Sequence, residues 1–527
     1  MFKPVKVIDI ETSRTIKTVN GLGRYHSIKG LVRFCRTPLG YIHLPVIDNK
    51  CEANTIIDVV IKKFSRSIIR KCLYNWLLLE QRLEISSVED LLNTPDYVNS
   101  KKQFPFVSVA VCTRDRADYL SGCLERLSQL DYPELEILVI DNASTSDETK
   151  TLVRKYPEMR YIYEPDPGLN IARNRAVSEA KGEIIAFTDD DAIVDHDWLY
   201  NLVNIFAQSP KVMGVTGLVV PYELKTEPQL LFENYNGFGR GFKQQWCCVK
   251  NNNAHSVAIF HGGTGKFGCG ANMSFRKTLF DKIGNFDPAL DVGTPTNGGG
   301  DLEIFFRVLK EGHSLVYEPG AIVYHKHRKK YSQLRSQISN WGIASTSYLI
   351  RSATAYPDER FALTAQWFGR LLCRNLPRLF ISLIAPKRLT RNLIVAELKG
   401  SFVGLSRYQA SCAIVRKVDP GFNLHLYKPD RSILKKKKDN SKGTFNIDLK
   451  HPLSELKEAE NYVESVFNIK FNDLPLGKIV IPNGYESIGI PRLSRAITDK
   501  FDIKLLNILL KKKYPAKANI KKAMRNF

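Results

Sequence analysis

Three consecutive acids stand at residues 189–191, after a short apolar segment at residues 184–187 and one threonine. Side chains alternate along an extended chain, so Asp189 and Asp191 can face one side while Asp190 faces away. Neighbouring carboxylates repel one another unless a cation neutralises them, and oxygen ligands suit Mg²⁺ or Mn²⁺ together with substrate phosphates. The triplet therefore predicts a divalent-metal site, although the same residues could form a solvated acidic turn that caps the next helix.

Polar side chains follow the other apolar segments of this region as well. Thr113 and Asp115 follow the first segment, Asp141 ends the second, and Arg173 comes after the third. A carboxylate at Asp141 can accept hydrogen bonds from a base or a ribose, and Arg173 can neutralise a phosphate. Each of these residues alone is more often a turn or capping residue, so the prediction of a nucleotide site depends on their meeting at one place.

Alternating strands and helices would bring these residues together. We expect strands at residues 106–111, 136–140, 160–163 and 184–187, and helices at residues 118–130, 146–156 and 170–180. Such alternation predicts a parallel sheet with helices on both faces. Right-handed crossovers place the carboxyl ends of all the strands at one edge, which is where ligands bind in such sheets.

Six motifs in this region, in this order, resemble those of family 2 glycosyltransferases of the GT-A fold. They are the opening strand with Thr113, VIDNAS ending at Ser144, GLNIARNRA from Gly168, FTDDDA from Phe187, GCGANMSFRK from Gly268 and GGGDLEIFFRVLKEGH from Gly298. The resemblance covers about residues 104–330, under half of the chain. It implies a Rossmann-like, doubly wound α/β sheet and an inverting transfer of a sugar from a nucleotide-sugar donor, with a UDP-sugar favoured, to a glycan or lipid-linked acceptor.

The resemblance also implies roles for single residues in binding the donor and the metal. Asp115 and Asp141 would hold the nucleoside, while Asp189 and Asp191 would bind Mn²⁺ or Mg²⁺ at the donor diphosphate. A bound cation of this kind stabilises charge on the leaving group. His325, which follows an expected strand at residues 314–318, would be a further metal ligand. The remaining residues expected at the donor are Thr113, Arg173, Asp190 and Asn272.

A sugar transfer also needs a base that takes the proton of the acceptor hydroxyl. The family uses an acid in a Glu-Asp pair at a helix start, and this chain has Gly300 and Asp301 there. We therefore predict Asp301 as the catalytic base, with Glu303 as the reserve candidate. The alternative for Asp301 is a helix N-cap after the glycines at residues 298–300.

Outside this region the chain is expected to contain four further parts. We expect an N-terminal α+β module at residues 1–100, the GT-A domain at 101–335, a helical and amphipathic segment at 336–416, a linker at 417–450 and a C-terminal module at 451–527. Both terminal modules contain a β-hairpin sequence, because PLGKIVIP at residues 475–482 matches PLGYIHLP at residues 38–45. A helix is expected at residues 56–79.

The formal net charge of +23 over 527 residues favours partners that carry phosphate. In residues 361–410, Arg370, Arg374 and Arg378 are four apart beside aromatic residues, which suits an anionic membrane surface. A core-packing helix with a solvated face is the alternative. No apolar stretch reaches the roughly 18 residues that a membrane span needs, and scattered cysteines fit a reducing compartment. We therefore expect a cytoplasmic protein, peripheral on the cytoplasmic face of a membrane.

Two other classes of protein are considered. A nucleotidyltransferase could use paired acids and Mg²⁺ on a similar sheet, but residues 112–116 contain no glycine of the kind that such enzymes place after the first strand. A non-catalytic basic binding protein is compatible with the charge and with the missing glutamate of the Glu-Asp pair. No nucleic-acid-binding motif is found, so nucleic acid is not an expected partner.

Overall fold

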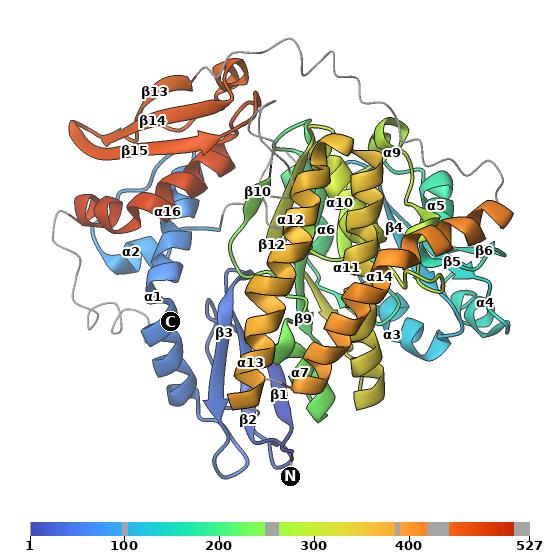
Figure 1. Cartoon of the computed structure of the whole chain (residues 1–527). Helices are drawn as coiled ribbons and strands as arrows, with labels where there is room; N and C mark the ends of the chain where they lie inside the picture. Colours follow the sequence, from blue (N-terminus) through green and yellow to red (C-terminus); the bar gives the residue numbers. More distant parts are fainter. Residues whose placement is uncertain (1, 97–103, 248–262, 385–389, 419–441, 511–527) are drawn as a thin grey trace. The chain divides into compact units, whose positions relative to one another are not determined.

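The computed structural model describes residues 2–96, 104–247, 263–384, 390–418 and 442–510 (Figure 1). Two compact units are present. The larger unit consists of Phe104–Phe206 and Val212–Lys436, and the smaller of Met1–Gln103, Ala207–Lys211 and Lys437–Phe527. The candidate site lies in the larger unit, so that unit is described first.

Nine described strands of the larger unit form one mixed sheet, with the order β10-β12-β9-β11-β7-β4-β5-β6 and with β8 paired to β12. The strands are β4 (Val107–Thr113), β5 (Leu135–Asn142), β6 (Met159–Glu164), β7 (Ile184–Asp189), β8 (Ala192–Val194), β9 (Val212–Pro221), β10 (Gln245–Cys247), β11 (Asn272–Arg276) and β12 (Ser314–His325). Strands β7, β4, β5 and β6 are parallel, as their alternation with helices predicts. The antiparallel strand β11 lies between β7 and β9 and ends the parallel part of the sheet.

The helices that connect the parallel strands also occur where the sequence predicts them. They are α3 (Ala117–Leu127), α4 (Glu148–Val153) and α5 (Leu169–Glu179). The chain continues with α6 (Trp198–Phe206), α7 (Glu227–Tyr235), η1 (Thr264–Lys266), α9 (Thr278–Ile283), η2 (Pro288–Leu290) and α10 (Gly300–Lys310). The predicted fold class, a doubly wound α/β sheet, is therefore confirmed.

Aromatic packing anchors the carboxyl end of β7, from which the acidic triplet begins. Phe187 contacts Phe286 and Phe275 with ring centroids 5.6 and 6.4 Å apart, and Phe305 packs on the far side of Phe275. All four rings are buried. Edge-to-face ring pairs add stability beyond the burial of their area, so this cluster holds the end of β7 firmly in place.

A group of helices follows the sheet in the sequence. It consists of α11 (Tyr331–Ala355), η3 (Pro357–Glu359), α12 (Arg360–Gly369), the π-helical turn η4 (Arg370–Asn375), α13 (Leu376–Ile384) and α14 (Arg391–Val418). Helices α11 and α14 approach closely because glycines stand where they meet: a Cβ atom at Gly342 or Gly400 would collide with the backbone of the other helix. Within the described residues, no helix combines the length and the apolarity that crossing a bilayer requires.

The smaller unit contains two copies of one motif, each a parallel strand, an antiparallel hairpin and a helix. The first copy has β1 (Val5–Glu11), β2 (Ser27–Phe34), β3 (Thr37–Pro45) and α1 (Ala53–Leu78), and the second has β13 (Lys442–Asp448), β14 (Glu464–Phe471), β15 (Leu474–Pro482) and α16 (Ile490–Leu509). Both hairpins are irregular at matching places, after Val32 and after Ile469. Two short helices, α2 (Val88–Leu92) and η5 (Lys457–Asn461), accompany the two copies. The predicted hairpins and the predicted first helix are therefore observed.

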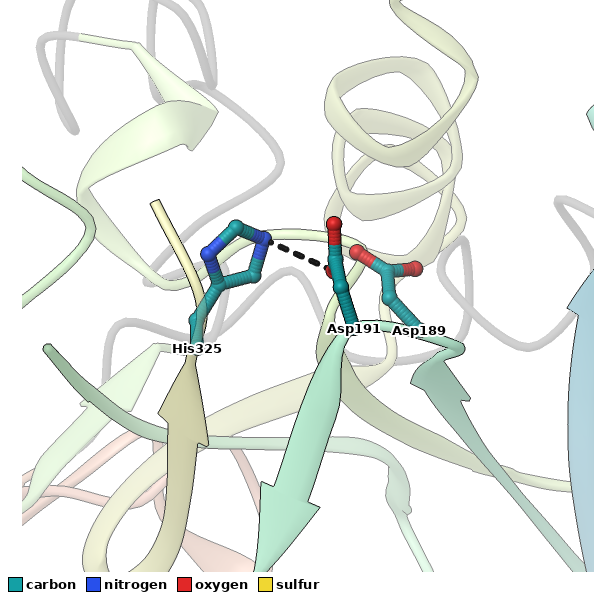
Figure 2. A group of neighbouring side chains, drawn as sticks. All are labelled: Asp189, Asp191 and His325. Atoms are coloured by element: carbon teal, nitrogen blue, oxygen red, sulfur yellow. Dashed lines mark ion pairs between the residues drawn. The ribbon is translucent and has the colours of Figure 1, made fainter. Parts of the chain in front are cut away.

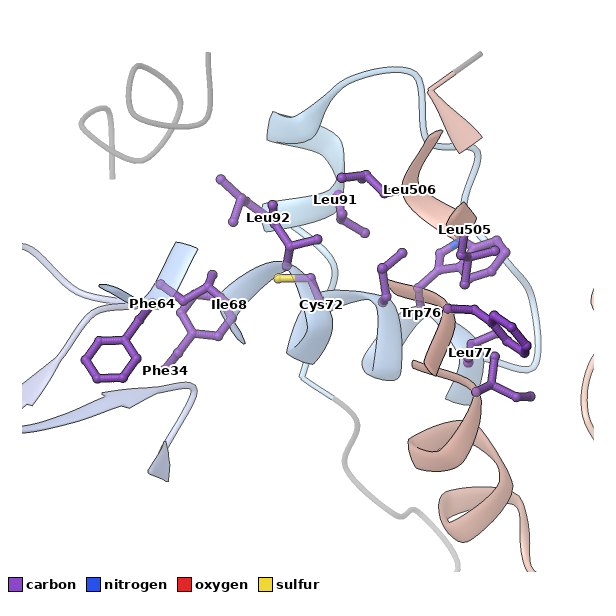
Figure 3. Packing of buried hydrophobic residues seen from close by; sticks show 14 of the residues in the cluster. Phe34, Phe64, Ile68, Cys72, Trp76, Leu77, Leu91, Leu92, Leu505 and Leu506 are labelled. Atoms are coloured by element: carbon purple, nitrogen blue, oxygen red, sulfur yellow. The ribbon is translucent and has the colours of Figure 1, made fainter. Parts of the chain in front are cut away.

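The two copies share one hydrophobic core. Phe64 and Trp76 of α1 and Leu505 of α16 belong to the same buried cluster (Figure 3). The ring of Trp76 also lies 6.2 Å from that of Phe471 in the second hairpin. The two modules, which the sequence left as separate parts, therefore pack on each other.

The predicted linker at residues 417–450 needs a correction. Residues 442–448 form the edge strand β13, which pairs in parallel with β14, because Phe445 and Ile447 alternate with polar residues and turn toward the shared core. Residues 417–418 still belong to α14. The rest of the predicted linker, residues 419–441 with the lysine run, lies outside the described residues.

Candidate active site

A cavity of about 930 Å³ opens at the carboxyl ends of the parallel strands. Thr113 at the end of β4, Asn142 at the end of β5 and Asp189 at the end of β7 line it, together with Gly168 before α5. These are the turns that the sequence places at one edge of the sheet. The cavity is large enough for a ligand of the size of a nucleotide.

Asp189, Asp191 and His325 meet at one side of this cavity (Figure 2). Each offers one ligand atom, and the three atoms lie within 4.8 Å of one another. His325 Nε2 is 3.2 Å from Asp191 Oδ1. The position of His325 follows from strand pairing, because the end of β12 pairs with β8 so that His325 is opposite Ala192, the residue after Asp191.

The charges of the three residues influence one another strongly. Burial and the neighbouring charge of Asp191 raise the pKa of Asp189. Burial acts in the same direction on Asp191, but the contacts with His325 and Arg116 outweigh it and lower the pKa of Asp191. Burial lowers the pKa of His325, yet its contact with Asp191 raises it overall. Two carboxylates and one imidazole nitrogen form a donor set that fits a divalent ion.

His325 is held by a second buried histidine. Its Nδ1 lies 3.1 Å from Nδ1 of His327, and Nε2 of His327 lies 3.0 Å from Glu233 Oε1. A hydrogen bond to the second ring nitrogen fixes the orientation of a metal-binding histidine. The chain from Glu233 through His327 therefore turns His325 toward Asp191.

Asp190 lies outside the group of ligand atoms that Asp189, Asp191 and His325 form, although it also lines the cavity. It accepts a hydrogen bond of 2.8 Å from the Thr113 hydroxyl and lies 2.7 Å from Nη1 of Arg116. Burial raises its pKa to about 7. Arg116 also contacts Asp191 at 2.6 Å. Arg116 was not among the residues expected at the site, although its place shortly after the first strand is a signal that could have been used.

Asp301 lines the cavity from the first turn of α10. Its Oδ2 accepts a 2.9 Å hydrogen bond from the Gly270 backbone N–H, and its Oδ1 accepts one of 2.9 Å from Leu302. The N-cap residue of α10 is Gly299, with φ of 107°, so Asp301 is not the helix cap. A carboxylate has about four acceptor positions, which leaves Asp301 able to accept from a hydroxyl group.

Glu303, the reserve candidate, does not reach the cavity. Its side chain is fully buried, and Oε1 lies 2.8 Å from Arg307 Nε and 2.7 Å from Arg351 Nη1. Arg351 also contacts Asp287 at 3.2 Å. Among the described residues that line the cavity Glu303 is absent, so this carboxylate belongs to a buried ion-pair network that joins α10 to α11.

Three of the residues expected at the donor are also absent from the described lining of the cavity. Asp141 is buried and accepts a hydrogen bond of 2.8 Å from the Tyr161 hydroxyl. Asp115, with a positive φ of 50°, accepts one of 2.7 Å from the backbone of Thr145. Asn272 is fully buried and accepts from the indole N–H of a tryptophan at 2.9 Å.

Arg173 lines the cavity as expected, and beside it lies an acid that sequence reasoning missed. Nη1 of Arg173 donates to Asn170 Oδ1 at 3.1 Å. Asp291 Oδ2 accepts from the backbone N–H of Asn170 at 2.8 Å, while Oδ1 is buried with no hydrogen-bond partner among the described residues. Burial raises the pKa of Asp291 to about 7. The single clue in the sequence was an acid directly after the short apolar stretch that ends at Leu290.

The arginine row of α12 to α13 does not form an outward basic face. Arg370 and Arg374 line the cavity, and Arg378 donates to the Tyr235 carbonyl at 2.9 Å. Nη2 of Arg374 lies 3.6 Å and Nη1 of Arg378 3.8 Å from the carboxylate of Glu397 in α14. The three arginines therefore point toward the interior of the unit, where Glu397 of α14 attracts Arg374 and Arg378.

Comparisons with known proteins identify this region. Over 238 residues, or 42% of this chain and 69% of the relative, the sequence is 24% identical to the glucosyl-dolichyl phosphate glucuronosyltransferase of Haloferax volcanii. Over 253 residues, or 45% of this chain and 74% of the relative, it is 26% identical to glycosyltransferase AglE of the same organism.

The solved structure of the mannosyltransferase PcManGT from Pyrobaculum calidifontis, in complex with GDP-Man and Mn²⁺, aligns with a TM-score of 0.40 and 18% identity over 66% of this chain and 98% of that one. The family model described as glycosyl transferase family 2 matches residues 108–284, which include the strands that carry the acidic triplet. Residues 108–284 are therefore similar to family 2 glycosyltransferases, and the sheet that they contribute to is of the GT-A type.

Proposed function

We propose that the protein is a metal-dependent, inverting glycosyltransferase that takes its sugar from a nucleotide-sugar donor. The observation that carries the proposal is the meeting of Asp189, Asp191 and His325 within 4.8 Å at the wall of a 930 Å³ cavity. Neighbouring carboxylates repel one another because they carry the same charge, and a cation between them removes this repulsion. A nitrogen ligand beside two carboxylates fits Mn²⁺ better than Mg²⁺, which prefers oxygen alone.

In this proposal the residues of the chain divide the work along the cavity. Asp189, Asp191 and His325 would hold the divalent ion, which would offset charge on the leaving diphosphate when bound. Arg173 would face the same diphosphate with its guanidinium group. Asp190 would act through Arg116 and Thr113, which it holds beside the metal ligands.

Asp301 would be the catalytic base. It would accept the proton of the acceptor hydroxyl while that oxygen attacks the anomeric carbon from the side opposite the diphosphate, so the configuration at that carbon inverts. Support for this role comes from its place on the cavity wall and from the two backbone N–H groups that orient it. Glu303 is not proposed for this role, because two arginines surround its carboxylate.

We also propose which base the donor carries and which kind of acceptor receives the sugar. We favour a UDP-sugar as the donor and a glycan or lipid-linked acceptor, used at a membrane surface. One relative, the glucuronosyltransferase of Haloferax volcanii, has a glucosyl-dolichyl phosphate in its name. Asp115 and Asp141, which lie near each other through Ser144, would approach the nucleoside only if their loops move on binding.

A ligand screen tests this proposal. The full chain is melted in the presence of UDP-, GDP-, dTDP- and CMP-sugars, with and without Mn²⁺, and release of the nucleoside diphosphate is measured in parallel. We expect one nucleotide-sugar to raise the melting temperature in Mn²⁺ and not in a chelator, because a ligand stabilises the state that it binds. A melting temperature that no nucleotide-sugar changes would rule the proposal out.

A further inference from the structure

The cavity has a second charged end, built from η4 and the helices beside it. Arg370 and Arg374 line the cavity there, and the strongest electrostatic influences on Arg370 come from Tyr348, Arg374 and Glu397. Arg370, Arg374 and Glu397 therefore form a group of charges on elements other than those that carry Asp189, Asp191 and His325.

Positive charge is in excess at this second end. Arg374 and Arg378 share the carboxylate of Glu397, which is buried and also accepts from the Tyr235 hydroxyl at 2.5 Å. Arg370 has no hydrogen-bond or ion-pair partner among the described residues. Loss of surrounding water lowers the pKa of Arg370. Three guanidinium groups therefore stand against one carboxylate, and a partly buried cation without a partner is stabilised when an anion joins it.

The outer side of the same helices is apolar and exposed. The exposed fraction is 82% for Phe361, 63% for Phe380 and 71% for Ile384. Further large apolar side chains are exposed nearby in sequence: Phe368, Leu372, Leu376, Ile381, Leu383, Phe402, Val403, Leu405 and Ile414. The π-helical turn η4 lies in the middle of this stretch, and such turns are frequent at functional sites.

Within α12, η4, α13 and α14 the exposed charges are all positive, and the exposed acid Asp358 stands in η3, just before α12. Within the described residues 361–384 and 390–418, Glu397 is the one acid, and it is buried. The exposed cations of α14 are Arg391, Lys399, Arg407, Arg416 and Lys417. Exposed apolar side chains on helices whose own exposed charges are positive complement the surface of an anionic lipid bilayer.

We propose that the Arg370 end of the cavity binds a phosphate group of the acceptor, and that a lipid at a membrane surface carries this acceptor. Guanidinium groups bind phosphate through paired N–H donors. The assignment to the acceptor rests on the proposed function, in which the donor diphosphate occupies the metal-binding end. The apolar face of α12 to α13 then rests on the bilayer while Arg370 and Arg374 reach the phosphate from the other side.

Two binding measurements on the full chain test this proposal, both in a chelator and without donor. Calorimetric titration measures affinity for inorganic phosphate, and flotation measures attachment to phosphatidylcholine vesicles with and without dihexadecyl phosphate. The wild type should bind phosphate, and Arg370→Ala should weaken that binding about 10-fold or more, because a hydrogen bond to a charged group contributes about 1.5–3 kcal/mol. Arg370→Gln, which keeps the length of the side chain, should weaken it as well.

Matched variants separate the two parts of the proposal. Arg407→Ala removes the same charge from an exposed position on α14 and should leave phosphate affinity unchanged. The double variant Phe361→Ser and Ile384→Ser should keep phosphate affinity and lose attachment to the dihexadecyl phosphate vesicles. Equal phosphate binding by Arg370→Ala and the wild type would overturn the site. Binding of soluble phosphate without attachment to those vesicles would overturn the lipid source.

The outcome does not depend on the transfer reaction, because the titration contains neither metal nor nucleotide-sugar. Phosphate binding at Arg370 in a chain that binds no nucleotide-sugar would refute the proposed function and leave this site standing. Nucleotide-sugar binding by a chain that does not bind inorganic phosphate would refute this site and leave the proposed function standing.

Discussion

Asp301 and Glu303 stand two residues apart on α10, yet their surroundings assign them different work. Asp301 faces the cavity and accepts hydrogen bonds from two backbone N–H groups, so it can also accept from a substrate hydroxyl. Glu303 is fully buried between Arg307 and Arg351. The helix turns the two side chains by about 200° relative to each other, which explains why only one of them reaches the cavity.

This difference predicts opposite effects of neutral substitutions. Asp301→Asn should lower the rate of sugar transfer by about 10²–10⁴-fold, the usual contribution of a general base, with an unchanged melting temperature. Glu303→Gln should lower the melting temperature, because breaking a buried ion pair costs about 3–5 kcal/mol. Turnover and melting curves of both variants check this. Wild-type turnover in Asp301→Asn would remove that residue from the reaction.

Asp291 predicts a dependence of stability on pH. Its pKa is raised to about 7 in the folded protein, whereas an exposed aspartate has a value near 3.8. A carboxyl group with a raised folded pKa holds its proton more tightly in the folded state, so the wild type loses stability as the pH rises from about 4 to 7. Asp291→Asn cannot ionise. The melting temperature of the variant minus that of the wild type should therefore increase over this window and level off above it.

A control for this prediction removes an acid charge elsewhere. Asp166→Asn replaces an exposed aspartate in the loop before α5, and its melting temperature relative to the wild type should change little between pH 4 and pH 7. A difference for Asp291→Asn that stays flat with pH would show that this carboxyl group is not destabilised by burial.

At the scale of elements, the contact between α11 and α14 depends on the absence of side chains. A Cβ atom at Gly400 would collide with the backbone oxygen of Ser339, and one at Gly404 with that of Ile343. Gly400→Ala should therefore lower the free energy of unfolding by about 1–3 kcal/mol through overpacking. Gly369→Ala in α12 is the matched control, because an added Cβ at Gly369 would meet no neighbouring atom within 4 Å. It should stabilise by about 0.5–1 kcal/mol. Urea unfolding measures both, and equal effects would contradict the packing.

The sequence predicts the elements that follow local patterns and misses those that depend on distant partners. Apolar strands alternate with helices from β4 to β7, and the carboxyl ends of these strands meet as expected. Strand β13 was not predicted, because it follows a lysine-rich stretch and has only two half-buried apolar side chains, Phe445 and Ile447, among its seven residues. Asp190 contributes no atom to the ligand group of Asp189, Asp191 and His325.

Within the site, the limits of prediction follow the same rule. The inward turn of Arg374 depends on Glu397, which is 23 positions later in the chain, and no local pattern reveals that partner. The place of Asp291 depends on backbone groups of α5, more than 100 positions earlier. Asp115 and Asp141 lie at or just after strand ends, but the Asp115 side chain bonds to Thr145 and that of Asp141 to Tyr161 of β6, and neither lines the cavity.

At the scale of the whole molecule, one unit carries the cavity and the other is a pair of repeated motifs with a common core. Helices α1 and α16 of the repeats are also joined by charge. Nε of Arg66 lies 2.8 Å and Nη2 of Arg70 2.9 Å from Asp502, whose side chain is 1% exposed. Burial raises the pKa of Asp502, but hydrogen bonds from the two arginines lower it overall.

Substitutions on α16 test how far this charge cluster stabilises the smaller unit. Asp502→Ala should lower the free energy of unfolding of that unit by about 1.5–3 kcal/mol, the range for hydrogen bonds to charged groups. Asp499→Ala, on the same helix, removes a half-exposed acid that lies 3.5 Å from Arg70 and should cost at most about 1 kcal/mol. Denaturant unfolding, monitored by tryptophan fluorescence, compares the two variants. Equal losses of unfolding free energy would show that the buried contacts of Asp502 stabilise the unit no more than the exposed contact of Asp499.

The central claim is that Asp189, Asp191 and His325 bind a divalent ion at the cavity, and a titration followed by electron paramagnetic resonance tests it most directly. The signal of free Mn²⁺ is measured as metal is added to the wild type, to Asp191→Asn and to the control Asp190→Asn, each with a nucleoside diphosphate. The account predicts one Mn²⁺ bound per wild-type chain, loss of this binding in Asp191→Asn, and binding that persists in Asp190→Asn because Asp190 contributes no atom to the ligand group. Equal Mn²⁺ binding by Asp191→Asn and the wild type would contradict it.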